Sequence, residues 1–114
     1  MFLAQVIGTV VAPVQIPFLD GKTLLLLRPV TPDGARTGKT RVALDHSGAG
    51  VGDRVLVLDE GNGARSIYGD SKAPIKTVVI GVVDYVETDA GRVYGHRAPD
   101  GAPDSIATAN EVTA

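Results

Sequence analysis

Two carboxylates and a cluster of glycines in residues 45–57 are the strongest candidates for chemistry in this sequence. The segment reads DHSGAGVGDRVLV. Glycine-rich loops bind phosphate through backbone N–H groups when they lead from a strand into a helix. Here the glycines lead into an alternating, β-branched run that begins at Asp53, which is typical of a strand. The order of residues therefore predicts a tight connection between two strands and not a phosphate site.

Each residue type in this connection has a simple geometric use. Gly48, Gly50 and Gly52 are expected to supply positive φ angles or to allow another backbone to approach closely. Asp45 and Asp53 flank the turn and are expected to accept hydrogen bonds from its N–H groups. No acid, base or nucleophile set accompanies them, so we expect no catalytic carboxylate pair. Two interpretations stay open: a purely structural turn, or a turn near a subunit contact or a central opening.

Other residues that could bind or catalyse are isolated. Arg65, in the tripeptide Gly63-Ala64-Arg65, carries a planar guanidinium with five donors, which suits carboxylates or carbonyls across an interface. The alternative is a solvated loop arginine. His46 and His96 are far apart and no cysteine accompanies them, so we expect neither a zinc site nor a cofactor.

Composition limits both the core and the partners. A chain of 114 residues is predicted to form one small domain that buries about two-thirds of its unfolded surface. Hydrophobic residues make up 44% of it and aromatic residues 4%, so the core must consist of Val, Leu, Ile and Ala, which suit strands. The net charge of −2 lacks the broad positive field that nucleic acids or anionic membranes attract.

The expected location follows from what the sequence lacks. It has no cysteine, no basic leader at the N-terminus and no apolar run of about 20 residues. We expect a soluble, cytoplasmic protein. A short basic cluster of Arg36, Lys39 and Arg41 is interpreted as a solvated loop, or as a contact with neighbouring proteins in an assembly.

Five segments have the apolar, β-branched content of strands. Gly8 is a candidate for a bulge in the first of them, and residues 61–69 leave room for about one turn of helix. Without crossover helices, the sheet is expected to be mainly antiparallel. We predict a mainly β, small five-stranded barrel of the OB type, closed or partly open. The five segments are residues 2–11, 22–28, 40–45, 53–58 and 77–86.

The first, second and fifth segments are apolar at consecutive positions. In a small barrel only alternate side chains point inward, and the sequence predicts no amphipathic helix to cover the others. A second copy of the chain is the simplest cover, so we predict self-association.

Five motifs occur in order along the chain. They are GTVVA from Gly8, LLLLRP from Leu24, the glycine-rich run from Asp45, GAR from Gly63 and VVIGVVD from Val78. Together, over residues 1–86, they resemble the EutN/CcmL family, the vertex proteins of bacterial microcompartment shells. The resemblance implies an OB-like barrel that assembles as a cyclic homopentamer.

The resemblance also implies a function. Members of this family are non-enzymatic and close the fivefold corners of a shell whose facets consist of hexameric shell proteins. An OB-type module that binds single-stranded nucleic acid or another ligand, and a small enzyme, are the alternatives. Nine residues are expected at a structural turn, a subunit interface or the pore: Asp45, Gly48, Ala49, Gly50, Gly52, Asp53, Gly63, Ala64 and Arg65.

The sequence changes character near residue 90. Residues 1–90 are predicted to form the barrel, and residues 91–114 a C-terminal extension. This extension is expected to hold a turn at residues 89–91, a short strand at 92–94 and a short helix at 105–112, capped by Asp104. It either contacts a neighbouring subunit or the shell, or is a loosely ordered terminus.

Overall fold

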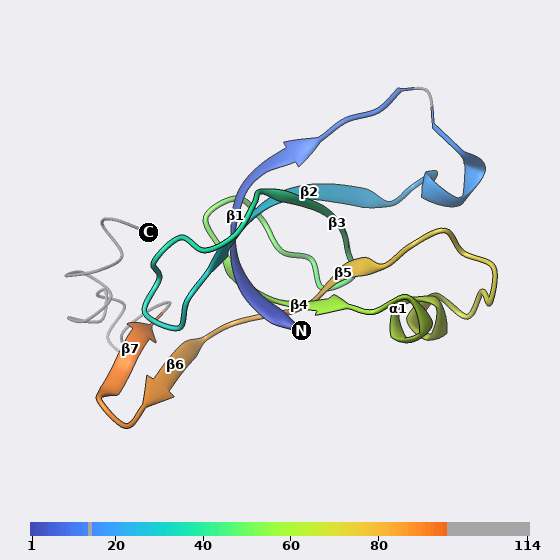
Figure 1. Cartoon of the computed structure of the whole chain (residues 1–114). Helices are drawn as coiled ribbons and strands as arrows, with labels where there is room; N and C mark the ends of the chain where they lie inside the picture. Colours follow the sequence, from blue (N-terminus) through green and yellow to red (C-terminus); the bar gives the residue numbers. More distant parts are fainter. Residues whose placement is uncertain (14, 96–114) are drawn as a thin grey trace.

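The structure is a computed structural model that describes residues 1–13 and 15–95 (Figure 1). Among these residues, no helix is long and apolar enough to span a bilayer. The regular elements follow one another along the chain as β1 (Phe2–Val10), the 3-10 helix η1 (Pro17–Leu19), β2 (Thr23–Val30), β3 (Arg41–Asp45), β4 (Arg54–Asp59), α1 (Gly61–Tyr68), β5 (Thr77–Val82), β6 (Tyr85–Thr88) and β7 (Gly91–Gly95).

Five strands close into a barrel in the order β1-β2-β3-β5-β4. All neighbours are antiparallel except β3 and β5, which pair in parallel over two residues. This order is that of an OB-type barrel, and the predicted fold is confirmed. The expected irregularity in β1 is also present, because Val6 faces Leu27 and Gly8 faces Leu26, which leaves Ile7 as an extra residue.

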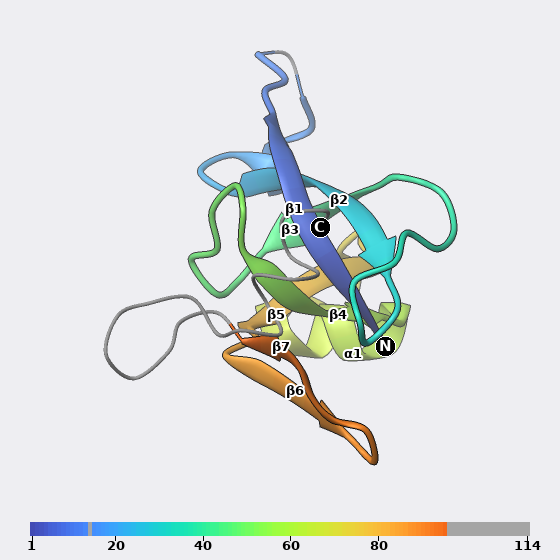
Figure 2. The ribbon, with the colours of Figure 1, turned by 90° about the vertical axis from the view of Figure 1, so that its left-hand side faces the viewer.

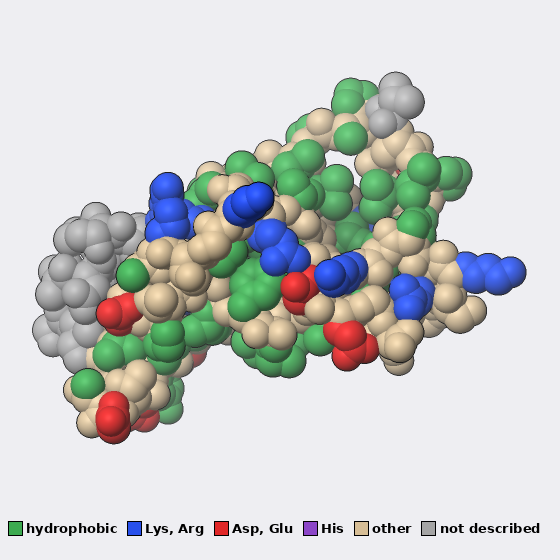
Figure 3. Space-filling view, in the orientation of Figure 1, with side chains coloured by type: hydrophobic (Ala, Val, Ile, Leu, Met, Phe, Trp, Pro, Cys, Tyr) green, Lys and Arg blue, Asp and Glu red, His purple; other side chains and the backbone are tan. Residues whose placement is uncertain are grey.

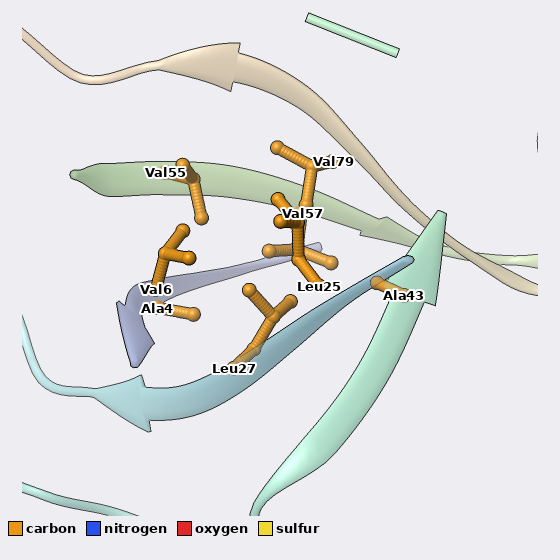
Figure 4. Close-up of a cluster of buried hydrophobic side chains, with 8 residues drawn as sticks. All are labelled: Ala4, Val6, Leu25, Leu27, Ala43, Val55, Val57 and Val79. Atoms are coloured by element: carbon orange, nitrogen blue, oxygen red, sulfur yellow. The ribbon is translucent and has the colours of Figure 1, made fainter. Parts of the chain in front are cut away.

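The barrel interior is filled by small aliphatic side chains from alternate strand positions (Figure 4). Leu25 and Leu27 of β2 point inward, whereas Leu24 and Leu26 are only half-buried on the outer face. The run of four leucines therefore serves both faces, as the sequence indicated. The buried cluster consists of Ala4, Val6, Leu25, Leu27, Ala43, Val55, Val57 and Val79.

A second cluster lies outside the barrel, and α1 covers it. The expectation that no helix covers the outer face is wrong, because Ala64 of α1 is fully buried with Leu44 of β3 and Val78 of β5. Around these three pack Phe18, Leu19, Leu24, Tyr68, Ile75 and Ile80.

The helix α1 is eight residues long, about twice what the sequence indicated. The Glu60 side chain accepts a hydrogen bond from the Gly63 N–H at 2.9 Å, and Gly69 ends the helix with a φ of 65°. Gly61 and Gly63 are poor helix formers, so local propensity underestimates the helix. Its tertiary contact through Ala64 compensates for them.

The predicted fifth strand ends earlier than expected. β5 stops at Val82, and the chain then forms a separate hairpin of β6 and β7, which extends away from the barrel (Figures 1 and 2). The expected turn and short strand near Arg92 are present as the hairpin turn and β7. Residue 90 lies in that turn, and the division of the chain there stays a prediction. The predicted helix at 105–112 and its cap lie outside the described residues.

The contact between α1 and the barrel can be tested at Ala64. Replacing Ala64 with Leu forces three extra carbons into a fully buried site, so we expect a loss of about 1–3 kcal/mol of unfolding free energy. Urea denaturation measures this. Ser66→Leu on the exposed side of the same helix is the control and should change stability by less than about 0.5 kcal/mol. Equal effects of the two substitutions would show that α1 does not pack as described.

Candidate functional site

The connection between β3 and β4 is a turn that its own two aspartates hold in place. Asp45 Oδ1 accepts hydrogen bonds from the Ser47 N–H at 3.0 Å and from Ser47 Oγ at 3.1 Å. Asp53 Oδ2 accepts from the Gly50 N–H at 2.8 Å. The prediction that both carboxylates accept hydrogen bonds from the turn is confirmed. Both side chains therefore stabilise the backbone conformation of the turn.

The three glycines of this turn are not equivalent. Gly48 and Gly52 have φ angles of +80° and +97°, a region that side chains with a Cβ rarely adopt. For Gly50 the expectation is wrong, because its φ is not positive and a Cβ there would meet only Asp53 Oδ2, at 4.0 Å. Gly50 serves through its backbone, which bonds to Asp53 in both directions.

The end of this turn is tied to β1 by backbone and side-chain bonds. The Gly52 N–H donates to the Val6 carbonyl at 2.9 Å, and the Val6 N–H donates to the Asp53 carbonyl at 2.9 Å. Gln5 Nε2 donates to the Gly52 carbonyl at 2.8 Å. The tip is open to solvent, with Val51 64% exposed, while Ala49 packs against the barrel core.

A buried polar group next to this turn was missed by the sequence analysis. Arg54 is fully buried on the outer face of β4, where its Nε donates to Gln5 Oε1 at 3.2 Å. The ring of Tyr94, itself 3% exposed, covers the guanidinium at 4.2 Å from its centroid. The register of β1 against β4 puts Gln5 opposite Arg54. No sequence pattern predicts this register, so the sequence analysis did not find the pair.

The residues Gly63, Ala64 and Arg65 lie on α1. A Cβ at Gly63 would lie 3.0 Å from Leu58 Cδ2, so glycine lets the helix approach β4 closely. Arg65 Nη2 donates to Asn62 Oδ1 at 2.6 Å within the same helix, which leaves the guanidinium at the surface. α1 meets the glycine-rich turn at its other end, where the Tyr68 ring lies 5.1 Å from that of His46.

Three titratable groups have displaced pKa values, each in a different part of the structure. A hydrogen bond from Thr31 lowers the pKa of Asp33 in the loop after β2. Burial alone would raise the pKa of Asp59, but a hydrogen bond from Thr77 and the charge of Arg41 outweigh it and lower the pKa. Burial, with a smaller effect of the Asp45 charge, raises the pKa of Tyr68.

These groups do not form an acid–base pair with one another. Within residues 1–13 and 15–95, no three His, Asp or Glu side chains are placed to hold a metal ion. His96 lies outside the described residues. The described geometry is that of a structural turn, a packed helix and a hairpin.

Comparison with known proteins decides the family. The model of the family described as ethanolamine utilisation protein EutN/carboxysome matches residues 1–84, the whole of the barrel. The chain belongs to the EutN/CcmL family. Its matched region includes every candidate residue, from Asp45 to Arg65.

The similarity to relatives and solved structures of the EutN/CcmL family extends over almost the whole length of those proteins. The shell vertex protein PduN of Salmonella typhimurium is 43% identical over 88 residues, which are 74% of this chain and 96% of PduN. The solved carboxysome subunit CcmL superposes with a TM-score of 0.77 at 37% identity, covering 85% of this chain and all of CcmL. The pentameric microcompartment shell protein GrpN of Rhodospirillum rubrum has a TM-score of 0.69 at 39% identity, covering 77% of this chain and 99% of GrpN.

The unequal glycines of the turn make a direct test. Gly48→Ala and Gly52→Ala each put a Cβ in the left-handed region, so we expect each to lower the unfolding free energy by about 1 kcal/mol. Gly50→Ala is the matched control and should stay within about 0.5 kcal/mol of the parent. Urea denaturation of all three compares them. A Gly50→Ala protein as unstable as the other two would contradict the turn geometry.

The Arg41–Asp59 ion pair, 2.8 Å long, gives a pH-dependent prediction. The pKa of Asp59 is lower in the folded protein than in the unfolded chain. The ionised carboxylate therefore stabilises the fold fully above the unfolded pKa of about 3.9, and this stabilisation is lost as pH falls below that value. Both side chains are partly exposed, so we expect Asp59→Asn to cost only about 1 kcal/mol at pH 7. The difference between variant and parent should shrink in denaturation curves from pH 5 to pH 3. A difference that stays constant over this range would show that the charge of Asp59 is not involved.

Proposed function

We propose that this chain is a structural shell protein that forms a homopentamer and caps the fivefold vertices of a bacterial microcompartment in the cytoplasm. The observation that carries this proposal is that the chain covers almost all of PduN in sequence (96%) and almost all of GrpN in structure (99%). PduN is named a shell vertex protein, and GrpN is described as pentameric. Hexameric shell proteins are the neighbours that such a vertex requires.

The described surface supports self-association. α1 and η1 cover one part of the outer barrel face, yet other apolar side chains stay exposed after the chain has folded. Large apolar groups left in water on a small domain favour association. The exposed members on the barrel strands and the hairpin are Ile7, Val42, Val82 and Tyr85, at 38%, 49%, 44% and 48%.

The two other function classes find less support. A binder of single-stranded nucleic acid needs a platform of exposed aromatic rings. Among the described aromatic residues only Tyr85 is exposed, and the others are half-buried or buried. An enzyme needs titratable groups gathered in a pocket, whereas Asp33, Asp59 and Tyr68 belong to separate elements. A non-enzymatic role is therefore part of the proposal.

We propose, further, that the exposed tip of the glycine-rich turn faces a neighbouring subunit or the central opening. Val51 is 64% exposed at this tip. A Cβ added to Gly48 or Gly52 would meet no other atom within 4 Å, so the surface there is open. Residues 63–65 then hold the helix against the barrel, with Arg65 at the surface. In this proposal residues 1–90 form the vertex domain and residues 91–114 an extension.

Native mass spectrometry of the purified chain tests the proposed function. We expect a five-subunit species that persists on dilution to the micromolar range. Titration of a fluorescent single-stranded oligonucleotide is the matching test of the alternative, which requires binding that weakens with salt. A stable monomer or dimer at high protein concentration would contradict the vertex proposal.

A further inference from the structure

The start of α1 contains the one Asn-Gly pair of this sequence, Asn62 and Gly63, because the other asparagine, Asn110, precedes a glutamate. Asparagine loses its side-chain amide most readily when glycine follows it. The backbone nitrogen of the glycine attacks the asparagine Cγ, and glycine has no Cβ to obstruct that approach. Asn62 is exposed, and Figure 3 shows a mainly tan, blue and red surface where Figure 1 places α1. Water therefore reaches this pair.

Both reacting groups have hydrogen-bond partners in the folded chain. The Gly63 N–H donates to Glu60 Oε1 at 2.9 Å, which makes Glu60 the N-cap of α1. Asn62 Oδ1 accepts from Arg65 Nη2 at 2.6 Å. The first bond fixes the orientation of the attacking nitrogen, and the second fixes that of the amide. Attack of the Gly63 nitrogen on Asn62 Cγ requires the backbone at Asn62 to leave its helical ψ angle.

The first turn of α1 has little else to stabilise it. Gly61 and Gly63 flank Asn62, and among all residue types only proline favours a helix less than glycine does. The buried residue of α1 is Ala64, which follows this turn. Weakly packed and exposed turns open locally far more often than the whole chain unfolds. The Glu60 cap therefore controls how often the Asn62 amide and the Gly63 nitrogen can meet.

We infer that Asn62 is a site of spontaneous deamidation and that the Glu60 cap protects it in the folded protein. When the first turn opens, the Gly63 nitrogen loses its proton to water and bonds to Asn62 Cγ. The side-chain nitrogen takes up a proton and leaves as ammonia. Water then opens the cyclic imide at one of its two carbonyls. The net reaction replaces ammonia by water, and nothing is oxidised or reduced.

The two products have opposite effects on α1. Opening at one carbonyl gives an aspartate at position 62, a negative charge in the first turn and three residues before Arg65, which stabilises a helix on both counts. Opening at the other carbonyl gives isoaspartate, which adds a carbon to the backbone. The added carbon disrupts the hydrogen-bond spacing of the first turn. It thereby weakens the neighbouring contact of Ala64 with Leu44 and Val78.

Peptide mapping of the full chain tests this inference. Cleavage after lysine and arginine isolates residues 55–65, in which Asn62 is the one asparagine. In mildly alkaline buffer we expect Glu60→Ala to form aspartate and isoaspartate at this position about fivefold faster than the parent, because the cap is lost. Asp70→Ala is the matched control and should react at the parent rate. The Asp70 side chain is also exposed and accepts one backbone N–H, from Lys72, at 2.9 Å.

The same measurement in urea separates protection by the fold from an effect of local sequence. Once the chain is unfolded, the parent, Glu60→Ala and Asp70→Ala should react at one common rate, which should exceed the rate of the folded parent. A fivefold difference that persists in urea would overturn the inference. Equal rates for the folded parent and folded Glu60→Ala would also overturn it, as would a folded parent that reacts as fast as the unfolded chain.

A conservative variant distinguishes protection from catalysis by the Glu60 carboxylate. Glu60→Gln keeps a side-chain oxygen that can accept from the Gly63 N–H, but it removes the negative charge. We expect its rate to lie between those of the parent and Glu60→Ala. If Glu60→Gln and Glu60→Ala both react more slowly than the parent, the carboxylate acts as a base for the Gly63 nitrogen, and the protective role is wrong.

Discussion

The fold depends on one constraint: its strands are apolar on both faces, and a five-stranded barrel can bury only one of them inside. The interior is filled by aliphatic side chains such as Ala4, Ala43 and Val79. Every strand still presents alternate side chains outward. The remainder of the structure, from α1 to the C-terminal hairpin, is arranged around those outward positions.

The chain covers its own outer face in two places. Ala64 brings α1 close to Leu44 and Val78, and the glycine at position 63 permits that approach because a side chain would meet Leu58. At the other end, Tyr94 of the hairpin closes over Arg54, whose Nε is bonded to Gln5. These covers rely on different physics: the first buries apolar area, and the second shields a buried charge with an aromatic face.

Part of the apolar surface stays exposed in the single chain, and this surface favours association with other copies. The half of β3 around Val42 pairs with β2 but has no strand on its other side, and Tyr85 of the β6–β7 hairpin is 48% exposed. The EutN/CcmL family supplies pentameric relatives of the same fold, such as GrpN. Exposed apolar side chains on a closed barrel are consistent with a protein that assembles with other copies, because association removes them from water and stabilises the assembled form.

Local patterns in the sequence determined the strands, the barrel class, the bulge near Gly8, the hydrogen-bonding roles of Asp45 and Asp53, and the family. These follow from side-chain alternation and turn chemistry, which act over a few residues. Tertiary structure alone decided three things: the full length of α1, the end of β5 at Val82, and the burial of Arg54 beneath Tyr94. Each depends on contacts between residues distant in sequence, so weak helix formers can form a helix and a strand can stop where its pairing ends. The same reason explains Gly50, whose φ is set by the turn that Asp53 holds and not by the glycine itself.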